Sequence, residues 1–359
     1  MTSEQPTIKE EAKLGIFEKY LTLWIVVCII MGILLGRFVP QLVSFLESVT
    51  IAELGYMPLP IGIFLFLVMY PTVASIKFKD VKKAAKAPKP TILTLIANWV
   101  IAPPMMVLLA SIFLSNYPEF AHGVILLGIA PCTAMVLFWI LFAKGNVAQG
   151  LIITAINAVS IVILYAPSAA FWLGVTGINM LEIITNIALS VVLFVGLPIV
   201  LGVVLRRDLM KRKGEAWYNK TYLGLMNKLA IIGLLGTLIV MFAYEGHTIL
   251  TQPFIIGLIA IPVFLHEAIM LPLLLGIAWF SNWDYETSVV SAIIGSSTHF
   301  EIAITVAITL FGVGSGAALA TVVGPLMEVP VMVGFAKLAL RTSHRFPRKK
   351  RANQRDNML

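Results

Sequence analysis

Ten apolar runs, each close to twenty residues long, dominate this sequence and leave no room for a large soluble domain. A helix needs about 20 apolar residues to cross the hydrocarbon core of a bilayer. Because a backbone in lipid must satisfy its own hydrogen bonds, such runs are expected to be helical. The sequence predicts an all-α polytopic membrane protein with spans over residues 20–39, 57–76, 91–114, 122–143, 147–172, 181–205, 223–244, 253–280, 288–311 and 316–340.

The composition supports a membrane protein and disfavours a soluble enzyme. Of the 359 residues, 59% are hydrophobic and 12% are charged, whereas soluble domains carry about 25% charged residues. The net charge of +8 does not indicate a nucleic-acid partner, because the basic residues lie in short runs between apolar segments, as in loops that face an anionic leaflet. Cys28 and Cys132 form neither a disulfide framework nor a metal motif. We therefore expect no cofactor and no resident metal.

The distribution of basic residues predicts the orientation of the chain. Lys and Arg cluster before the first span and after the second, fourth, sixth and tenth spans, which puts these connections on one side if there are ten crossings. Arg37 is the exception on the opposite side. We expect both termini to be cytoplasmic in a plasma or bacterial inner membrane, with a leading segment at 1–19 and a basic tail at 341–359.

Two segments share a pattern that predicts an internal repeat. "GIAPCTAMVLFWILFAKG" (128–145) aligns with "GSSTHFEIAITVAITLFG" (295–312), with glycine at both ends of each. Five crossings separate them, so the two halves, 20–172 and 181–340, would insert with opposite orientations, as in secondary transporters built from inverted repeats. The breaking residues at the start of each stretch predict broken helices that cross near mid-membrane. A proline kink without a function is the alternative.

Ionisable residues within the apolar spans predict coupling to protons or cations. A carboxylate at the bilayer centre costs roughly 3 kcal/mol, so several of them indicate a role. The sequence places His266 and Glu267 in the eighth span, His299 and Glu301 in the ninth, and Glu328 in the tenth. Buried carboxyl groups of this kind can load and release a proton at working pH. The alternative for each is a hydrogen-bonded group that holds helices together.

The thiol of Cys132 is a candidate solute ligand. Cys132 follows Pro131, and proline suits the first turn of a helix. If a half-helix begins there, its positive end favours the thiolate, and a soft sulfur suits a thiophilic solute. A small apolar residue buried for packing is the alternative. Asn98 and Asn157 are polar residues inside the third and fifth spans. For each of them the sequence is equally compatible with contact to the solute and with a hydrogen bond between helices.

Two long stretches of the sequence, "PCTAMVLFWILFAKGN" (131–146) and "SSTHFEIAITVAITLFGVGSGAALATVVGPLMEVPVMV" (296–333), carry a family resemblance. They are similar to the two signature stretches of the arsenite permease family of arsenical-resistance efflux transporters, within the bile-acid/arsenite/riboflavin transporter superfamily. Residues 59–81 and 98–114 are similar to its second and third helices. The resemblance implies ten helices in a 5+5 inverted repeat, a panel domain beside a core domain, and export of trivalent arsenic in exchange for protons.

The resemblance also implies roles for individual residues. Cys132 matches the family's cysteine on helix four, and Glu301 and Glu328 match its glutamates on helices nine and ten. By this resemblance the two glutamates would couple protons, and the position of His266 and Glu267 in an apolar span predicts that they take part as well. The predicted solute-binding residues are Cys132, Pro131, His299, Thr298, Ser297 and Asn98.

The sequence departs from the family pattern around this site. Pro131 stands where the family has Arg, and Ile140-Leu141 stands where it has Asn-Asp. His299 replaces an Asn, and the pair His266-Glu267 is an addition. The site is therefore a divergent version of the family's site.

Our leading hypothesis is a proton-coupled exporter of arsenite or a related metalloid such as antimonite. The alternative is a sodium-coupled carrier of organic anions, like the bile-acid symporters, in which Cys132 is incidental. A membrane sensor is disfavoured because no signalling domain is appended, and an enzyme because His266-Glu267 does not continue into a zinc motif. The expected partners are a small solute, protons and the lipid bilayer; the oligomeric state is left open.

Overall fold

The computed structural model describes residues 21–51, 57–74, 88–133, 135–174 and 180–347. Apart from two short antiparallel strands, β1 (Thr50–Ile51) and β2 (Met57–Pro58), the regular structure of these residues is helical, as predicted. Helices lie at each of the ten predicted spans, and further short helices lie between or after them. They are α2 (Leu21–Phe38), α3 (Pro40–Ser48), α4 (Leu59–Ala74), α6 (Pro88–Ile96), η2 (Ala97–Ile101), α7 (Ala102–Phe113), α8 (Pro118–Ile129), α9 (Val136–Phe142), α10 (Val147–Gly174), α11 (Met180–Val191), η3 (Val192–Gly196), α12 (Leu197–Lys213), α13 (Glu215–Trp217), η4 (Tyr218–Tyr222), α14 (Leu223–Thr251), α15 (Pro253–Phe280), α16 (Tyr285–Ser296), α17 (Phe300–Phe311), α18 (Gly316–Thr342) and η5 (Ser343–Arg345).

Six helical stretches of the described residues are long and apolar enough to cross a membrane by themselves. A seventh is the pair α2 and α3, which is bent by 101° between the two helices. Shorter apolar helices are found in α4, α8 and α17. The chain is therefore a multi-span membrane protein. The six long stretches are Pro88–Phe113, Val147–Gly174, Ile187–Lys213, Glu215–Gly246, Pro253–Phe280 and Gly316–Arg345.

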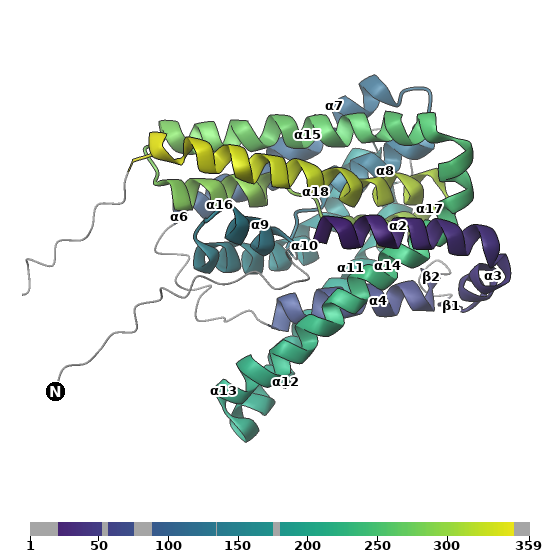
Figure 1. The fold of residues 1–359 in the computed structure, drawn as a ribbon, viewed down its shortest axis with the longest axis horizontal. Coiled ribbons are helices and arrows are strands. Elements are labelled where there is room, and N and C mark those ends of the chain that lie inside the picture. Colours follow the sequence, from purple (N-terminus) through teal and green to yellow (C-terminus); the bar gives the residue numbers. More distant parts are fainter. Residues whose placement is uncertain (1–20, 52–56, 75–87, 134, 175–179, 348–359) are drawn as a thin grey trace, which may run out of the picture.

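The helices pack in two groups. In the first group, α14 packs along α2 and α4, and α12 packs on α4. In the second, α18 contacts α8, α15 and α17, while α15 also packs on α7 and α16. Figure 1 shows α15 and α18 running side by side, with α12 and α13 projecting beyond the rest of the bundle. Helix α11 packs on α10 and α17 of the second group and continues through η3 into α12 of the first.

Local sequence explains where several helices begin and end. Asp284 caps α16 by accepting a hydrogen bond from the Thr287 N–H, at 3.1 Å, and Ser315 caps α18 in the same way. Side chains of this type satisfy N–H groups that the first turn leaves unpaired. Gly214 ends α12 and Gly312 ends α17, with φ of +83° and +88°, a left-handed conformation that favours glycine.

Two of the predicted spans are broken helices. The fourth consists of α8 and α9, which are separated after Ile129 by extended backbone. The ninth consists of α16 and α17, which are separated by residues 297–299. Both breaks fall at the predicted motifs, Gly-Ile-Ala-Pro and Gly-Ser-Ser-Thr. The third span carries a different irregularity, the π-helical turn η2 between α6 and α7.

Candidate functional site

The two broken helices cross at their extended segments. Pro131 and Thr298 form an antiparallel bridge. The N–H of His299 donates to the carbonyl of Ala130 at 2.8 Å, and the N–H of Cys132 donates to the carbonyl of Ser297 at 3.3 Å. Each break therefore satisfies part of the other's backbone, which is how irregular backbone is tolerated inside a bundle.

The prediction that a half-helix begins at Pro131 is wrong. Ala130 has an extended conformation, with φ of −90° and ψ of 105°, and helix α9 begins only at Val136. Cys132 lies in the extended break, because its N–H is taken by the pairing with Ser297 rather than by a helical turn. A helix dipole acts only over the first turn, so α9 does not promote the thiolate of Cys132.

The second break has its ionisable residues at the start of a helix. His299 is the N-cap residue of α17, and Glu301 lies in the first turn, where a negative side chain interacts favourably with the dipole. His299 Nε2 and Glu301 Oε2 are 3.4 Å apart, and both side chains are buried. The predicted solute-binding residues Cys132, Pro131, Ser297, Thr298 and His299 thus come together at one crossing.

Two further carboxyl groups extend the site toward neighbouring helices. Glu328 of α18 faces the Ser297 hydroxyl and interacts electrostatically with Glu301. Glu267 of α15 interacts in the same way with Glu328. Each of the three carboxyl groups is at most 2% exposed. The structure therefore links α15, α18 and α17 through a row of buried acids.

Several buried polar atoms of this region have no hydrogen-bond partner among the described residues. A buried polar group without a partner costs free energy, so a cluster of them indicates a place where water, a proton or a solute binds. These atoms include Asn98 Nδ2, Thr298 Oγ1, His299 Nδ1, Glu301 Oε1, both ring nitrogens of His266 and both carboxyl oxygens of Glu267. Among the described residues, no hydrogen bond joins the His266 ring to the crossing, although His266 neighbours Glu267 in the sequence.

Asn98 lies on the π-helical turn η2, which packs against α16. The neighbouring Trp99 indole N–H donates to the Ser160 hydroxyl of α10 at 3.1 Å. Asn157, one turn earlier on α10, is fully buried. No feature of the sequence predicted this turn, although π-helical turns are frequent at functional sites.

The glycines that begin the two aligned stretches have a packing role. A Cβ at Gly128 would clash with the Met106 side chain of α7, and one at Gly295 would lie 2.6 Å from Leu274 and 3.0 Å from Ala97. These close approaches hold the third span against both broken helices. The glycines that end the two stretches, Gly145 and Gly312, differ in backbone conformation. Gly312 has a positive φ, whereas in the first stretch the residue with positive φ is Lys144, one position before Gly145.

Glu245 of α14 is also buried, at 1% exposed, and was not predicted from the sequence as a candidate residue. It lies in the first helix group rather than at the crossing. The sequence feature that could have identified Glu245 is its position directly after the predicted apolar span 223–244. Within the described ranges, no three His, Cys, Asp or Glu side chains are grouped as metal ligands.

Residues 62–252 match the sodium bile acid symporter family. The chain is 40% identical over 360 residues to an uncharacterized transporter from Synechocystis sp., covering 95% of this chain and 93% of the relative. It is 37% identical over 358 residues to the arsenical-resistance protein Acr3 of Alkaliphilus metalliredigens, covering 96% and 98%. The Acr3 of Corynebacterium glutamicum is 34% identical over 341 residues, covering 93% and 91%.

The chain belongs to the arsenite permease family, within the sodium bile acid symporters. The resemblance predicted from the two signature stretches is thereby confirmed. Its relatives are transporters, so this protein is a membrane transporter of a small solute and not an enzyme. The buried crossing is consequently a candidate solute site.

Proposed function

We propose that this protein exports arsenite, or a related trivalent metalloid such as antimonite, in exchange for protons. The observation that carries the proposal is the pairing of the Cys132 segment with Ser297–His299, directly before Glu301. This arrangement combines a soft sulfur ligand with a carboxyl group at one buried point. Two relatives that cover nearly the whole chain are named arsenical-resistance proteins.

The membrane topology belongs to this proposal. Ten crossings in two inverted five-helix repeats would place both termini in the cytoplasm of a plasma or inner membrane. The two broken helices, which meet at equivalent breaks, support such a repeat. The group of α2, α4, α12 and α14 would be the panel, and the helices around α18 the core.

Arsenous acid is neutral at pH 7, so the site needs hydrogen-bonding groups and a thiol more than a counter-charge. The Cys132 thiol replaces one hydroxyl of the acid, forming a sulfur–arsenic bond and releasing water; hydrolysis of that bond restores both. Ser297, Thr298, His299 and Asn98 supply polar contacts. One thiol holds the metalloid weakly enough for release.

Proton exchange uses the row of buried acids. A proton from outside loads Glu301 or Glu328, the metalloid leaves Cys132, and the core moves against the panel before the proton leaves inside. Glu267 and His266 assist this transfer. The crossing side chains are almost fully buried, so a solute reaches them only when the two helix groups move.

A sodium-coupled organic-anion carrier is the second candidate function. It is favoured by the match of residues 62–252 to the sodium bile acid symporters, and by the oxygen-rich crossing. In that case carboxylates and carbonyls would bind sodium, and Cys132 would be a packing residue.

The two thiols of the chain provide a matched test of the proposal. In an arsenite-sensitive bacterial strain, Cys132→Ser should abolish the resistance conferred by the protein, whereas Cys28→Ser should retain it. Cys28 is equally buried, but it lies on α2, away from the crossing. Membrane fractions should contain both variants at the wild-type amount. Full resistance with Cys132→Ser would exclude the thiol mechanism.

A further inference from the structure

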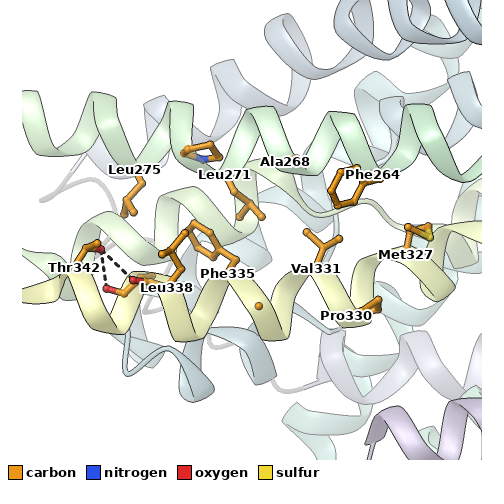
Figure 2. A pocket seen from close by; sticks show the side chains of 13 residues that line it. Phe264, Ala268, Leu271, Leu275, Met327, Pro330, Val331, Phe335, Leu338 and Thr342 are labelled. Carbon is orange, nitrogen blue, oxygen red and sulfur yellow. Dashed lines mark hydrogen bonds between the residues drawn. The ribbon is translucent and has the colours of Figure 1, made fainter.

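A groove runs between α15 and α18. It has a volume of about 620 Å³, and its lining is almost entirely apolar. Figure 2 shows Leu271 and Leu275 of α15 facing Phe335 and Leu338 of α18 across this space. At one end Thr342 turns its hydroxyl back onto the carbonyls of its own helix, at 3.0 and 3.3 Å. The groove therefore offers apolar contacts along its whole length.

A second cavity lies beyond the groove, at the ends of the same two helices. It has a volume of about 390 Å³ and, unlike the groove, its lining is about half polar. Trp279 lies one turn beyond Leu275 on α15, and Arg345 lies one turn beyond Thr342 after α18. The Trp279 indole N–H donates to the Arg345 carbonyl at 3.1 Å, which joins the two walls. The cavity is lined by Trp279, Phe280, Asn282, Arg345, Phe346 and Pro347.

The polar cavity lies in a strongly basic part of the chain. Lys337, Arg341 and Arg345 are exposed on the last turns of α18 and on η5, and the sequence at 348–359 adds further Lys and Arg residues. Basic pockets between membrane helices on the cytoplasmic side bind anionic lipid head groups. An Arg also forms bidentate hydrogen bonds with phosphate.

We propose that this groove and cavity bind one anionic phospholipid of the cytoplasmic leaflet. One acyl chain lies between α15 and α18, and the phosphate is held at Arg345. The assignment of the lipid to the cytoplasmic leaflet rests on the topology proposed above. The choice of an anionic phospholipid rests instead on the apolar groove and the basic residues beside it. The groove spans residues 264–275 of α15 and 327–342 of α18, or roughly 16 and 22 Å at 1.5 Å per residue, so it is long enough for the roughly 15 Å of one leaflet's hydrocarbon. Arsenite is too small and too polar to occupy this lining.

The bound lipid would lie directly behind the row of buried acids. Met327, which lines the inner end of the groove, immediately precedes Glu328, and Ala268 immediately follows Glu267. An acyl chain packed there fixes the distance between α15 and α18. We therefore expect transport to depend on anionic lipid.

Two substitutions test the acyl-chain contact and the head-group contact of the lipid separately. Gly334 lines the groove, and a Cβ added there has no neighbour within 4 Å among the described residues. Gly334→Leu therefore fills the groove without a clash, and Gly257→Leu at an equally open position of α15 is its control. Arg345→Gln removes the phosphate contact, and Arg207→Gln at the exposed end of α12 is the control for charge.

The experiment is native mass spectrometry of the full-length protein purified with an equimolar mixture of phosphatidylglycerol and phosphatidylcholine. We expect phosphatidylglycerol to be retained preferentially. Arg345→Gln should weaken this retention about fivefold, which corresponds to about 1 kcal/mol per basic residue. Gly334→Leu should abolish it, while the two controls should match the wild type.

Two results would overturn the proposal. One is equal retention of the two lipids, or a loss that the control variants share. The other is a dimer that forms through this face, so that Gly334→Leu releases monomers and leaves lipid retention unchanged. Failure of arsenite transport in the same preparation would count against the proposed function alone, because lipid retention is measured without any solute.

Discussion

Gly123 of α8 packs directly against α18, and its replacement by alanine tests the packing of the candidate site. A Cβ at Gly123 would clash with the Ala317 carbonyl oxygen and lie 2.8 Å from the Ala320 Cβ. Ordinary contacts between carbon atoms are about 3.5–4.0 Å, so α8 must move by roughly 1 Å. The atoms that it meets belong to the backbone or to a Cβ, and neither can rotate away.

The expected net effect is a loss of stability. Overpacking costs typically about 1–3 kcal/mol, while replacing a helical glycine by alanine returns at most about 1 kcal/mol. Gly123→Ala should therefore destabilise the protein by up to about 2 kcal/mol, the difference between the larger overpacking cost and the gain in helix propensity. Gly257→Ala on α15 gains the same helix propensity without a clash and should be neutral or stabilising.

Thermal unfolding of both variants in one detergent, followed by tryptophan fluorescence, measures this contrast. Gly123→Ala should melt several degrees below the wild type, and Gly257→Ala at or above it. A Gly123→Ala variant as stable as Gly257→Ala would refute the close packing of α8 on α18.

Three other substitutions test separate parts of the structure. Glu301→Gln should abolish the pH-driven component of transport, whereas Glu245→Gln, at a buried acid outside the crossing, should keep it; equal loss in both would contradict the coupling role. Asp284→Ala should lower the stability by about 1 kcal/mol through loss of the α16 cap, and an unchanged melting temperature would contradict the cap. Tyr165→Phe removes the hydroxyl that donates to the Leu126 carbonyl at 3.1 Å and should also cost about 1 kcal/mol, which chemical denaturation in mixed micelles would measure.

The positions of the helices follow from local sequence, whereas the pairing between them does not. Runs of apolar residues predicted helices at all ten spans because a backbone in lipid has few alternatives. Glycine and proline likewise located both breaks. The bridge between Pro131 and Thr298 joins residues far apart in the chain, and no local preference encodes such a pairing.

The error at Pro131 has the same origin. Proline is compatible with both a first helical turn and an extended segment, and the sequence alone favoured the helix. The backbone of the other break decided the outcome by accepting the Cys132 N–H. The bend between α2 and α3 was also missed, since Pro40 starts a new helix within what reads as a span end.

The row of buried acids was predicted as individual residues, but not as a row. The sequence shows that Glu267, Glu301 and Glu328 lie in apolar spans. Only the packing of α15, α17 and α18 shows that Glu328 interacts electrostatically with both Glu267 and Glu301. The helices could have turned these side chains toward different neighbours with the same apolar pattern.

The most direct test of the central claim is uptake of arsenite by everted membrane vesicles that contain the protein, with and without an imposed pH gradient. Vesicles acidified inside should accumulate arsenite, collapse of the gradient should stop accumulation, and vesicles with Cys132→Ser should not accumulate it. Sodium should have no effect. Absence of arsenite uptake under a pH gradient, together with sodium-dependent movement of a bile acid, would contradict the account and favour the organic-anion carrier.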